Sequence, residues 1–257
     1  MSKSSRASCT LNASPGILLG LCFLALPACT DPENTGSPGL GRGAEEAGDQ
    51  APEAGAEGPN LRFGSDGTFT IVHFTDTQDD QDIDPRTVGL MAAVLDDHQP
   101  DLVVFTGDNV RSGPETVEDV RRAINAIAHP VDSRGIPWLI TFGNHDEDHM
   151  PRTGVGEGAM LDYYMSFPNN LNRPGPEGVT GTGNMQVLVY ASAGDEPLFN
   201  VWALDSGRYA SDSIAGQSIE ADGLRSYDWI RPSQLFWYAR TSEEIERRFG
   251  RKVPGLM

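Results

Sequence analysis

Cysteine is almost absent from this chain. The 257 residues contain three cysteines, and all of them lie among the first 29 residues, as Cys9, Cys22 and Cys29. After residue 29 the sequence therefore offers no disulfide, no thiolate metal site and no cysteine nucleophile. These absences exclude zinc fingers, iron–sulfur proteins and cysteine hydrolases.

Long hydrophobic runs are also absent, because no stretch reaches the roughly 18–20 apolar residues that a transmembrane helix needs. The apolar run Ile17–Leu26 follows Lys3 and Arg6, which is typical of a secretory signal. The sequence Leu26–Cys29 (LPAC) resembles a bacterial lipobox, in which the cysteine is lipidated and becomes the first mature residue. We expect residues 1–29 to export the protein and to anchor it to a membrane through Cys29, facing the periplasm or the cell surface. The alternative is an ordinary signal peptide that is cut at a nearby small residue, which would leave the protein secreted.

Basic side chains are scarce. There are 19 Lys and Arg residues against 37 Asp and Glu residues, which gives a formal net charge of −18. Such a surface repels a phosphate backbone, so we expect no nucleic-acid partner. Residues 30–60 contain seven acids, one base and one large apolar residue, Leu40. They cannot bury enough surface to fold, so we predict a disordered linker, and we place the folded part at residues 61–257.

Strands and helices alternate in the first half of the folded part. Its apolar patterns predict, in order, strand Thr68–Thr75, helix Arg86–His98, strand Leu102–Thr106, helix Glu115–His129 and strand Trp138–Phe142. Asp84 and Pro85 are placed to begin the first helix, and Pro114 and Pro130 to bound the second. This βαβαβ order indicates an α/β fold with a parallel sheet. Later patterns predict strands Val187–Tyr190 and Phe199–Leu204, helices Ser233–Tyr238 and Ser242–Arg251, and loops Gly154–Gly158 and Gly175–Gly183.

Polar side chains follow each of the first three predicted strands. Asp76, Asp108 and Asn144 are these residues, and His145 comes next in the chain. Because ligands bind at the carboxyl ends of parallel strands, we expect these side chains to converge. Oxygen donors together with an imidazole suit Mn, Fe, Zn or Mg. The spacing therefore predicts a metal site.

The residues around these positions resemble the motifs of the calcineurin-like metallophosphoesterases. Asp76-Thr77-Gln78, Gly107-Asp108-Asn109 and Gly143-Asn144-His145-Asp146 match, in order, the family blocks D-x-H, G-D and G-N-H-D/E. Phe199–Ser206 (FNVWALDS) and the segment 227–234 resemble the branch related to purple acid phosphatases. The resemblance runs from about residue 69 to the end of the chain, and it implies a layered α/β fold with flanking helices.

The resemblance also implies roles for individual residues. Asp108 would bridge two divalent metal ions, with Asp76 on the first metal and Asn144 on the second. A two-metal site lowers the pKa of a bridging water, and the resulting hydroxide attacks the phosphorus of a phosphate ester. His145 would face the phosphate and Asp146 would orient the ring of His145. Whether the substrate is a monoester or a diester stays open.

The sequence departs from the family pattern in two places. Gln78 stands where the family has the histidine of D-x-H; it is either a weaker ligand through its carbonyl oxygen or a hydrogen-bonding neighbour. The family's later histidine-ended strand and G-H-x-H block have no counterpart in this sequence. We therefore expect an N-terminal portion of the domain that lacks the C-terminal strands, with only Asp108 and Asn144 on the second metal.

Other polar residues are given ordinary structural roles. We expect His73 to be hydrogen-bonded within its strand, and His98 and His129 to end helices. His149, just past the site loop, is the one further histidine that could be recruited as a ligand. Arg111 could reach a phosphate or lie at the surface, and Asp205 could help to shape the cleft.

Three hypotheses for function remain. The favoured one is a metal-dependent phosphoesterase on an exported lipoprotein. The second is a catalytically weak or inactive remnant that binds a metal or a phosphate group. The third is a phosphatase of the haloacid-dehalogenase type with Asp76 as its nucleophile, but Gln78 occupies the position where that chemistry needs a second aspartate.

Overall fold

The computed structural model describes residues 60–210, 213–214, 217–218 and 227–257, which belong to one compact unit. The expected signal with Cys29, and the expected linker up to residue 59, lie outside the described residues. Within the described part, none of the helices is long and apolar enough to cross a membrane.

The first sheet is the parallel sheet that the sequence predicts. It has the order β1-β2-β3, and these strands are Ile71–Phe74, Leu102–Thr106 and Trp138–Thr141. Between them run α1 (Pro85–His98) and α2 (Val117–Asp132). Asp84 caps α1 by accepting a hydrogen bond from the backbone of Arg86, as expected from its position before Pro85.

Helix α2 differs from its prediction at both ends. Thr116 and Asp119 form a reciprocal capping box, so the helix starts at Val117, two residues later than predicted. Pro130 was expected to end the helix but lies inside it. A proline in the last turn costs one hydrogen bond, whereas Pro130 and Val131 are both buried in the core. Burial of these two residues therefore extends the helix to Asp132.

The second sheet has the order β4-β5-β8. Strand β4 (Met185–Tyr190) is antiparallel to β5 (Pro197–Ala203), and β8 (Gly255–Leu256) pairs with β5 in parallel. Helix α5 (Pro232–Phe249) is continuous where the sequence predicted two shorter helices. The remaining elements are short, namely α3 (Met150–Thr153), α4 (Glu157–Tyr164), β6 (Ser213–Ile214) and β7 (Gln217–Ser218). The predicted loop at residues 154–158 thus gives way to α4 at Glu157.

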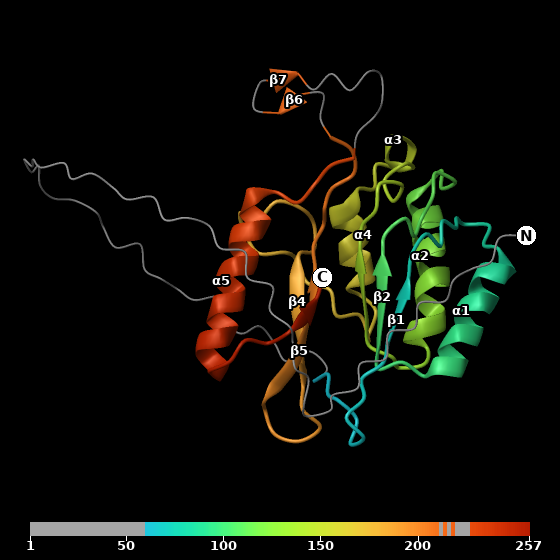
Figure 1. Cartoon of the computed structure of the whole chain (residues 1–257). Coiled ribbons are helices and arrows are strands. Elements are labelled where there is room, and N and C mark those ends of the chain that lie inside the picture. The colour runs from blue at the N-terminus through green and yellow to red at the C-terminus, as the bar shows by residue number, and fades with distance from the viewer. Residues whose placement is uncertain (1–59, 211–212, 215–216, 219–226) are drawn as a thin grey trace, which may run out of the picture. The chain divides into compact units, whose positions relative to one another are not determined.

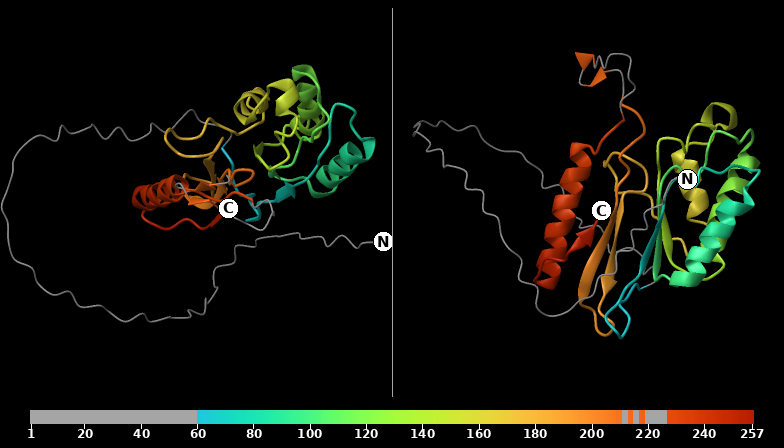
Figure 2. Two further views of the ribbon diagram at one scale, coloured as in Figure 1. Left: turned by 90° about the horizontal axis from the view of Figure 1, so that it is seen from above. Right: turned by 45° about the vertical axis from the view of Figure 1, so that its right-hand side comes forward.

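The two sheets pack face to face between layers of helices (Figures 1 and 2). Side chains alternate along β2, so Val103 and Phe105 join the core under α1, α2 and α4, while Leu102 joins the core between the sheets. On the far side of the second sheet, the ring of Trp202 packs against Trp237 and Tyr238 of α5. This arrangement confirms the layered α/β fold and directs the carboxyl ends of β1, β2 and β3 toward one edge.

Candidate functional site

The loops after β1 and β2 run side by side beyond the ends of the strands. The backbone amide of Asp76 donates to the carbonyl of Gly107 (3.2 Å), and the amide of Gln78 donates to the carbonyl of Asp108 (2.9 Å). Sheet-like pairing therefore continues into the loops. The structure brings Asp76, Gln78 and Asp108 to adjacent positions at one edge of the sheet.

Three of these residues adopt a backbone conformation that side chains other than glycine rarely occupy. Their φ angles are 54° at Asp76, 42° at Gln78 and 51° at Asp108. Left-handed backbone of this kind costs of order 1 kcal/mol or more per residue and is concentrated at functional sites. Its presence in both site loops supports a role that goes beyond joining strands to helices.

Glycine lets the loops after β2 and β3 approach each other closely. A Cβ atom on Gly107 would lie 2.4 Å from the backbone nitrogen of Gly143, and a Cβ on Gly143 would lie 2.3 Å from Oδ1 of Asp108. Both distances are well below the 3.0 Å that a Cβ atom keeps from non-bonded atoms in real proteins. The G-D and G-N-H-D motifs therefore need their glycines so that the Asp108 carboxylate can pack against the next loop.

Asp146 is fully buried and holds the β2 and β3 loops together. Its carboxylate accepts four backbone hydrogen bonds of 2.7–3.0 Å, donated by Gly143, Asp108, Asn109 and Val110. Burial raises the pKa of Asp146 to about 6, although these hydrogen bonds oppose the shift. The prediction that Asp146 orients the ring of His145 is therefore wrong, because its carboxylate points into the turn.

His145 has a different partner. Its Nδ1 lies 2.6 Å from Oδ2 of Asp148, and its backbone amide donates to Oδ1 of Asp108 (2.8 Å). The hydrogen bond to Asp148 raises the pKa of His145, with a smaller contribution from the charge of Asp108. About 41% of the His145 side chain is exposed, so a ligand can reach the ring. This residue pair can hold a positive charge beside an anionic substrate.

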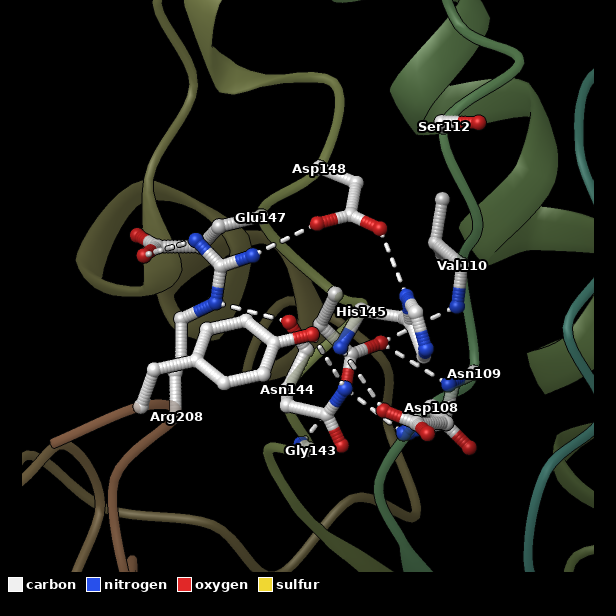
Figure 3. Close-up of polar contacts among 12 residues, drawn as sticks. Asp108, Asn109, Val110, Ser112, Gly143, Asn144, His145, Glu147, Asp148 and Arg208 are labelled. Atoms are coloured by element: carbon white, nitrogen blue, oxygen red, sulfur yellow. Dashed lines mark hydrogen bonds and ion pairs between the residues drawn. The ribbon is translucent and has the colours of Figure 1, made fainter. Parts of the chain in front are cut away.

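Two residues that follow β5 reach the same loop from the second sheet. Arg208 donates to Asp148, Glu147 and the backbone carbonyl of Asn144, as Figure 3 shows. The amide Nδ2 of Asn144 donates to the hydroxyl of Tyr209 (2.8 Å). The site predicted from the sequence did not include Asp148, Arg208 or Tyr209. Two features of the sequence could have indicated them: Asp148 lies three residues after His145, and Arg208 and Tyr209 follow the strand that became β5.

The other candidate residues are used elsewhere. His149 is buried, its Nδ1 is hydrogen-bonded to the Thr153 hydroxyl, and its Nε2 has no partner. Arg111 pairs with Asp80 (2.6 Å). Asp205 is buried and accepts backbone hydrogen bonds in the loops that border the second sheet, from Thr182 and Gly207.

The donor set fits a hard divalent cation. Asp76 and Asp108 offer carboxylates, and Gln78 and Asn144 offer amide oxygens, a combination that suits Mg²⁺ or Mn²⁺ better than a softer metal. Among the described residues, no three His, Cys, Asp or Glu side chains are grouped so that they could hold a metal. Asp76, Gln78 and Asp108 are the residues that could hold one cation, and Asp108 and Asn144 are those that could contact a second.

A family model of the calcineurin-like phosphoesterases matches residues 69–248, which is most of the described part of the chain. The chain belongs to this family. It is 29% identical over 234 residues to "Probable inactive purple acid phosphatase 29" of Arabidopsis thaliana. The matched region covers 79% of the chain and 56% of that relative. It is 30% identical to "Probable inactive purple acid phosphatase 14" of the same plant, over 77% of the chain and 54% of the relative.

A yeast relative carries a different name. "Phosphatase DCR2" of Saccharomyces cerevisiae is 31% identical over 65% of the chain and 27% of the relative. No solved structure matches the chain. The chain thus spans about half the length of the two plant relatives. Family membership confirms the resemblance and leaves the haloacid-dehalogenase hypothesis without support. Members of the family are phosphoesterases and generally bind two divalent metals.

Proposed function

We propose that this protein hydrolyses a phosphate ester with divalent metal ions bound at the carboxyl ends of β1, β2 and β3. The observation that carries the proposal is the joined pair of loops after β2 and β3. Asp146 and the two glycines hold Asp108 next to His145, and the ring of His145 is paired with Asp148. A carboxylate that can bind a metal, next to a residue whose ring can carry a proton, suits a reaction in which metal-activated water attacks an anionic phosphate ester.

Asp76, Gln78 and Asp108 would hold the first cation, and Asp108 with Asn144 would contribute to the second. When bound, such metals polarise the phosphoryl oxygens and lower the pKa of a bound water. Left-handed backbone at Asp76, Gln78 and Asp108 sets the direction in which these three side chains leave the loops. The hydrogen bond from Asn144 Nδ2 to Tyr209 identifies the other amide atom, Oδ1, as the donor available to a metal.

His145 would act on the substrate itself. Its raised pKa keeps a larger fraction of the ring protonated near neutral pH. With Nδ1 engaged by Asp148, Nε2 is the atom that can donate a hydrogen bond to a phosphate oxygen or a proton to the leaving oxygen. Loss of this donor would slow hydrolysis about 10²- to 10⁴-fold, the usual contribution of a positioned general acid.

The test is Mn²⁺-dependent hydrolysis of p-nitrophenyl phosphate and of bis(p-nitrophenyl) phosphate by the full chain. We expect Asp108→Asn to abolish activity on whichever ester is cleaved, because the Asp108 carboxylate would contact both proposed cations. Asp97→Asn is the matched control, since Asp97 is an exposed carboxylate on α1. Full activity in the Asp108→Asn protein would refute the proposal.

A second candidate function is binding of a metal or phosphate without turnover. It is favoured by the two carboxylates in the donor set, by the lack of a described His, Cys, Asp or Glu cluster, and by the word "inactive" in the plant relatives' names. Calorimetric titration with Mn²⁺ and with inorganic phosphate distinguishes the two functions. Heat of binding that Asp108→Asn removes, in a protein without hydrolysis, supports the binder; no heat at all eliminates it.

We also propose that the protein is exported and anchored through lipidated Cys29. The support comes from the sequence Leu26–Cys29 after an apolar run of signal length. In a bacterial host, wild-type protein should partition into detergent and Cys29→Ser protein into the aqueous phase. Equal partitioning of the two proteins would contradict the anchor.

A further inference from the structure

Arg208 follows β5 and makes three hydrogen bonds to the loop that carries His145. Its Nε donates to the backbone carbonyl of Asn144 (2.8 Å), its Nη2 to Oδ1 of Asp148 (2.7 Å) and its Nη1 to Oε2 of Glu147 (3.4 Å). The guanidinium is planar and its donors point in fixed directions. Three acceptors on one loop therefore fix the position of that loop relative to the second sheet.

Asp148 is held at both of its oxygens. Oδ1 receives the hydrogen bond from Arg208, while Oδ2 is paired with Nδ1 of His145 (2.6 Å). In Figure 3 the Asp148 carboxylate lies between the guanidinium and the imidazole. Arg208 therefore restrains the carboxylate that in turn contacts the imidazole.

Arg208 is itself fixed by its surroundings. The backbone amide of Asp228 donates to the carbonyl of Arg208 (3.4 Å). The guanidinium carbon of Arg208 lies 5.8 Å from the centre of the Tyr209 ring. Tyr209 in turn accepts the hydrogen bond from the Asn144 amide. Two consecutive residues of the segment after β5 therefore contact the same loop, and both of them bond Asn144.

We infer that Arg208 is a positioning residue, which holds Asp148 and, through Asp148, the imidazole of His145 in the orientation that phosphate-ester hydrolysis requires. The inference rests on the proposed function. Only about 26% of the Arg208 side chain is exposed, and all three of its nitrogens donate to the loop. These contacts assign it to the loop and not to the substrate phosphate.

A double-mutant cycle tests this coupling. We expect Arg208→Gln to lower kcat for the aryl phosphate about 10- to 100-fold, the size expected when a catalytic group is displaced by about 1 Å, with KM changed less than about threefold. Because the effect passes through Asp148, the Arg208→Gln/Asp148→Asn protein should be no slower than Asp148→Asn alone. Multiplied losses in the double variant, or a raised KM with unchanged kcat, would overturn the inference.

Arg134→Gln is the matched control. Arg134 also bonds a carboxylate, Asp96 (2.8 Å), and a backbone carbonyl, that of Pro130 (2.6 Å), with 30% of its side chain exposed, but it precedes β3 instead of following a strand. We expect Arg134→Gln to keep wild-type kcat. An equal loss in this variant would mean that removing any half-buried arginine loosens the protein, and the inference would fail.

A measurement that needs no activity separates this inference from the proposed function. In metal-free protein labelled with ¹⁵N-histidine, the His145 ring signals can be assigned by their loss in His145→Gln. Arg208→Gln should move those signals in the same direction as Asp148→Asn and leave the exposed His98 unchanged. Absence of hydrolysis in every protein would refute the proposed function only, whereas unmoved His145 signals in Arg208→Gln would refute the positioning role.

Discussion

Replacing Glu157 by Gln should stabilise the protein at alkaline pH. Glu157 is the first residue of α4, and its carboxyl group is mostly buried near the carboxylates of Asp205 and Glu147. Burial is the largest cause that raises the pKa of Glu157, from 4.5 to about 7, and the two acidic neighbours add to it, while a hydrogen bond with Thr182 opposes it. Glutamine has nearly the same shape, keeps a hydrogen-bonding group for Thr182 and carries no charge.

The sign follows from proton binding. Between pH 4.5 and about 7 the folded protein holds a proton on Glu157 that the unfolded chain has released, so stability falls as pH rises through this window. A shift of this size corresponds to about 3 kcal/mol at most, and partial solvent exposure reduces it to about 2 kcal/mol. The variant should therefore gain about 2 kcal/mol at pH 8 and almost nothing at pH 4.5.

Thermal unfolding of chelator-treated protein at pH 4.5 and at pH 8 provides the assay. For a domain of this size, about 2 kcal/mol corresponds to a rise in Tm of roughly 4–8 °C. Glu177→Gln is the matched control, because Glu177 is exposed. A Tm gain that is the same at both pH values, or no gain at pH 8, would refute the argument from the buried charge.

Three further substitutions, one of them with its own control, test the loops and the cap of α2. Asp146→Asn should lower the free energy of unfolding in urea by about 3 kcal/mol, because two backbone amides would face an NH₂ group instead of an oxygen. Gly143→Ala should lower the free energy of unfolding by about 1–3 kcal/mol in the same assay and reduce Mn²⁺-dependent hydrolysis. Gly158→Ala in α4 is its control, because a Cβ there meets no atom within 4 Å, and it should be neutral or stabilising by up to about 1 kcal/mol. Thr116→Ala should cost about 1 kcal/mol by thermal unfolding, through loss of the capping box, and leave hydrolysis unchanged.

Local patterns in the sequence were enough to predict the first sheet. The apolar runs that became β2 and β3, and the cap at Asp84 followed by Pro85, are signals contained within a few residues. The errors arose where distant contacts decide the structure. Pro130 stays within α2 because the core buries it, and Trp237 and Tyr238 of the continuous helix α5 pack on Trp202 of β5. Neither contact can be read from a short stretch of sequence.

The same division applies to the candidate site. Asp76, Asp108 and Asn144 could be predicted because each follows a strand of one parallel sheet, and parallel strands bring their carboxyl ends together. The partner of His145 could not, because adjacency in the sequence favoured Asp146, whereas its carboxylate is taken by four backbone amides of the turn. These amides donate to Asp146, and a buried donor without an acceptor is costly.

The candidate site is not built from the first sheet alone. The segment that follows β5 contributes residues that contact the β3 loop. The Asp146 carboxylate fixes the backbone of the β3 loop from within, whereas the Asn144 amide and one oxygen of Asp148 have partners outside the loop. Tyr209 and Arg208 supply them from the segment after β5, 60 or more residues later in the chain. The orientation of His145 therefore depends on how the two sheets pack, and changes in the core between them should alter hydrolysis without touching a ligand.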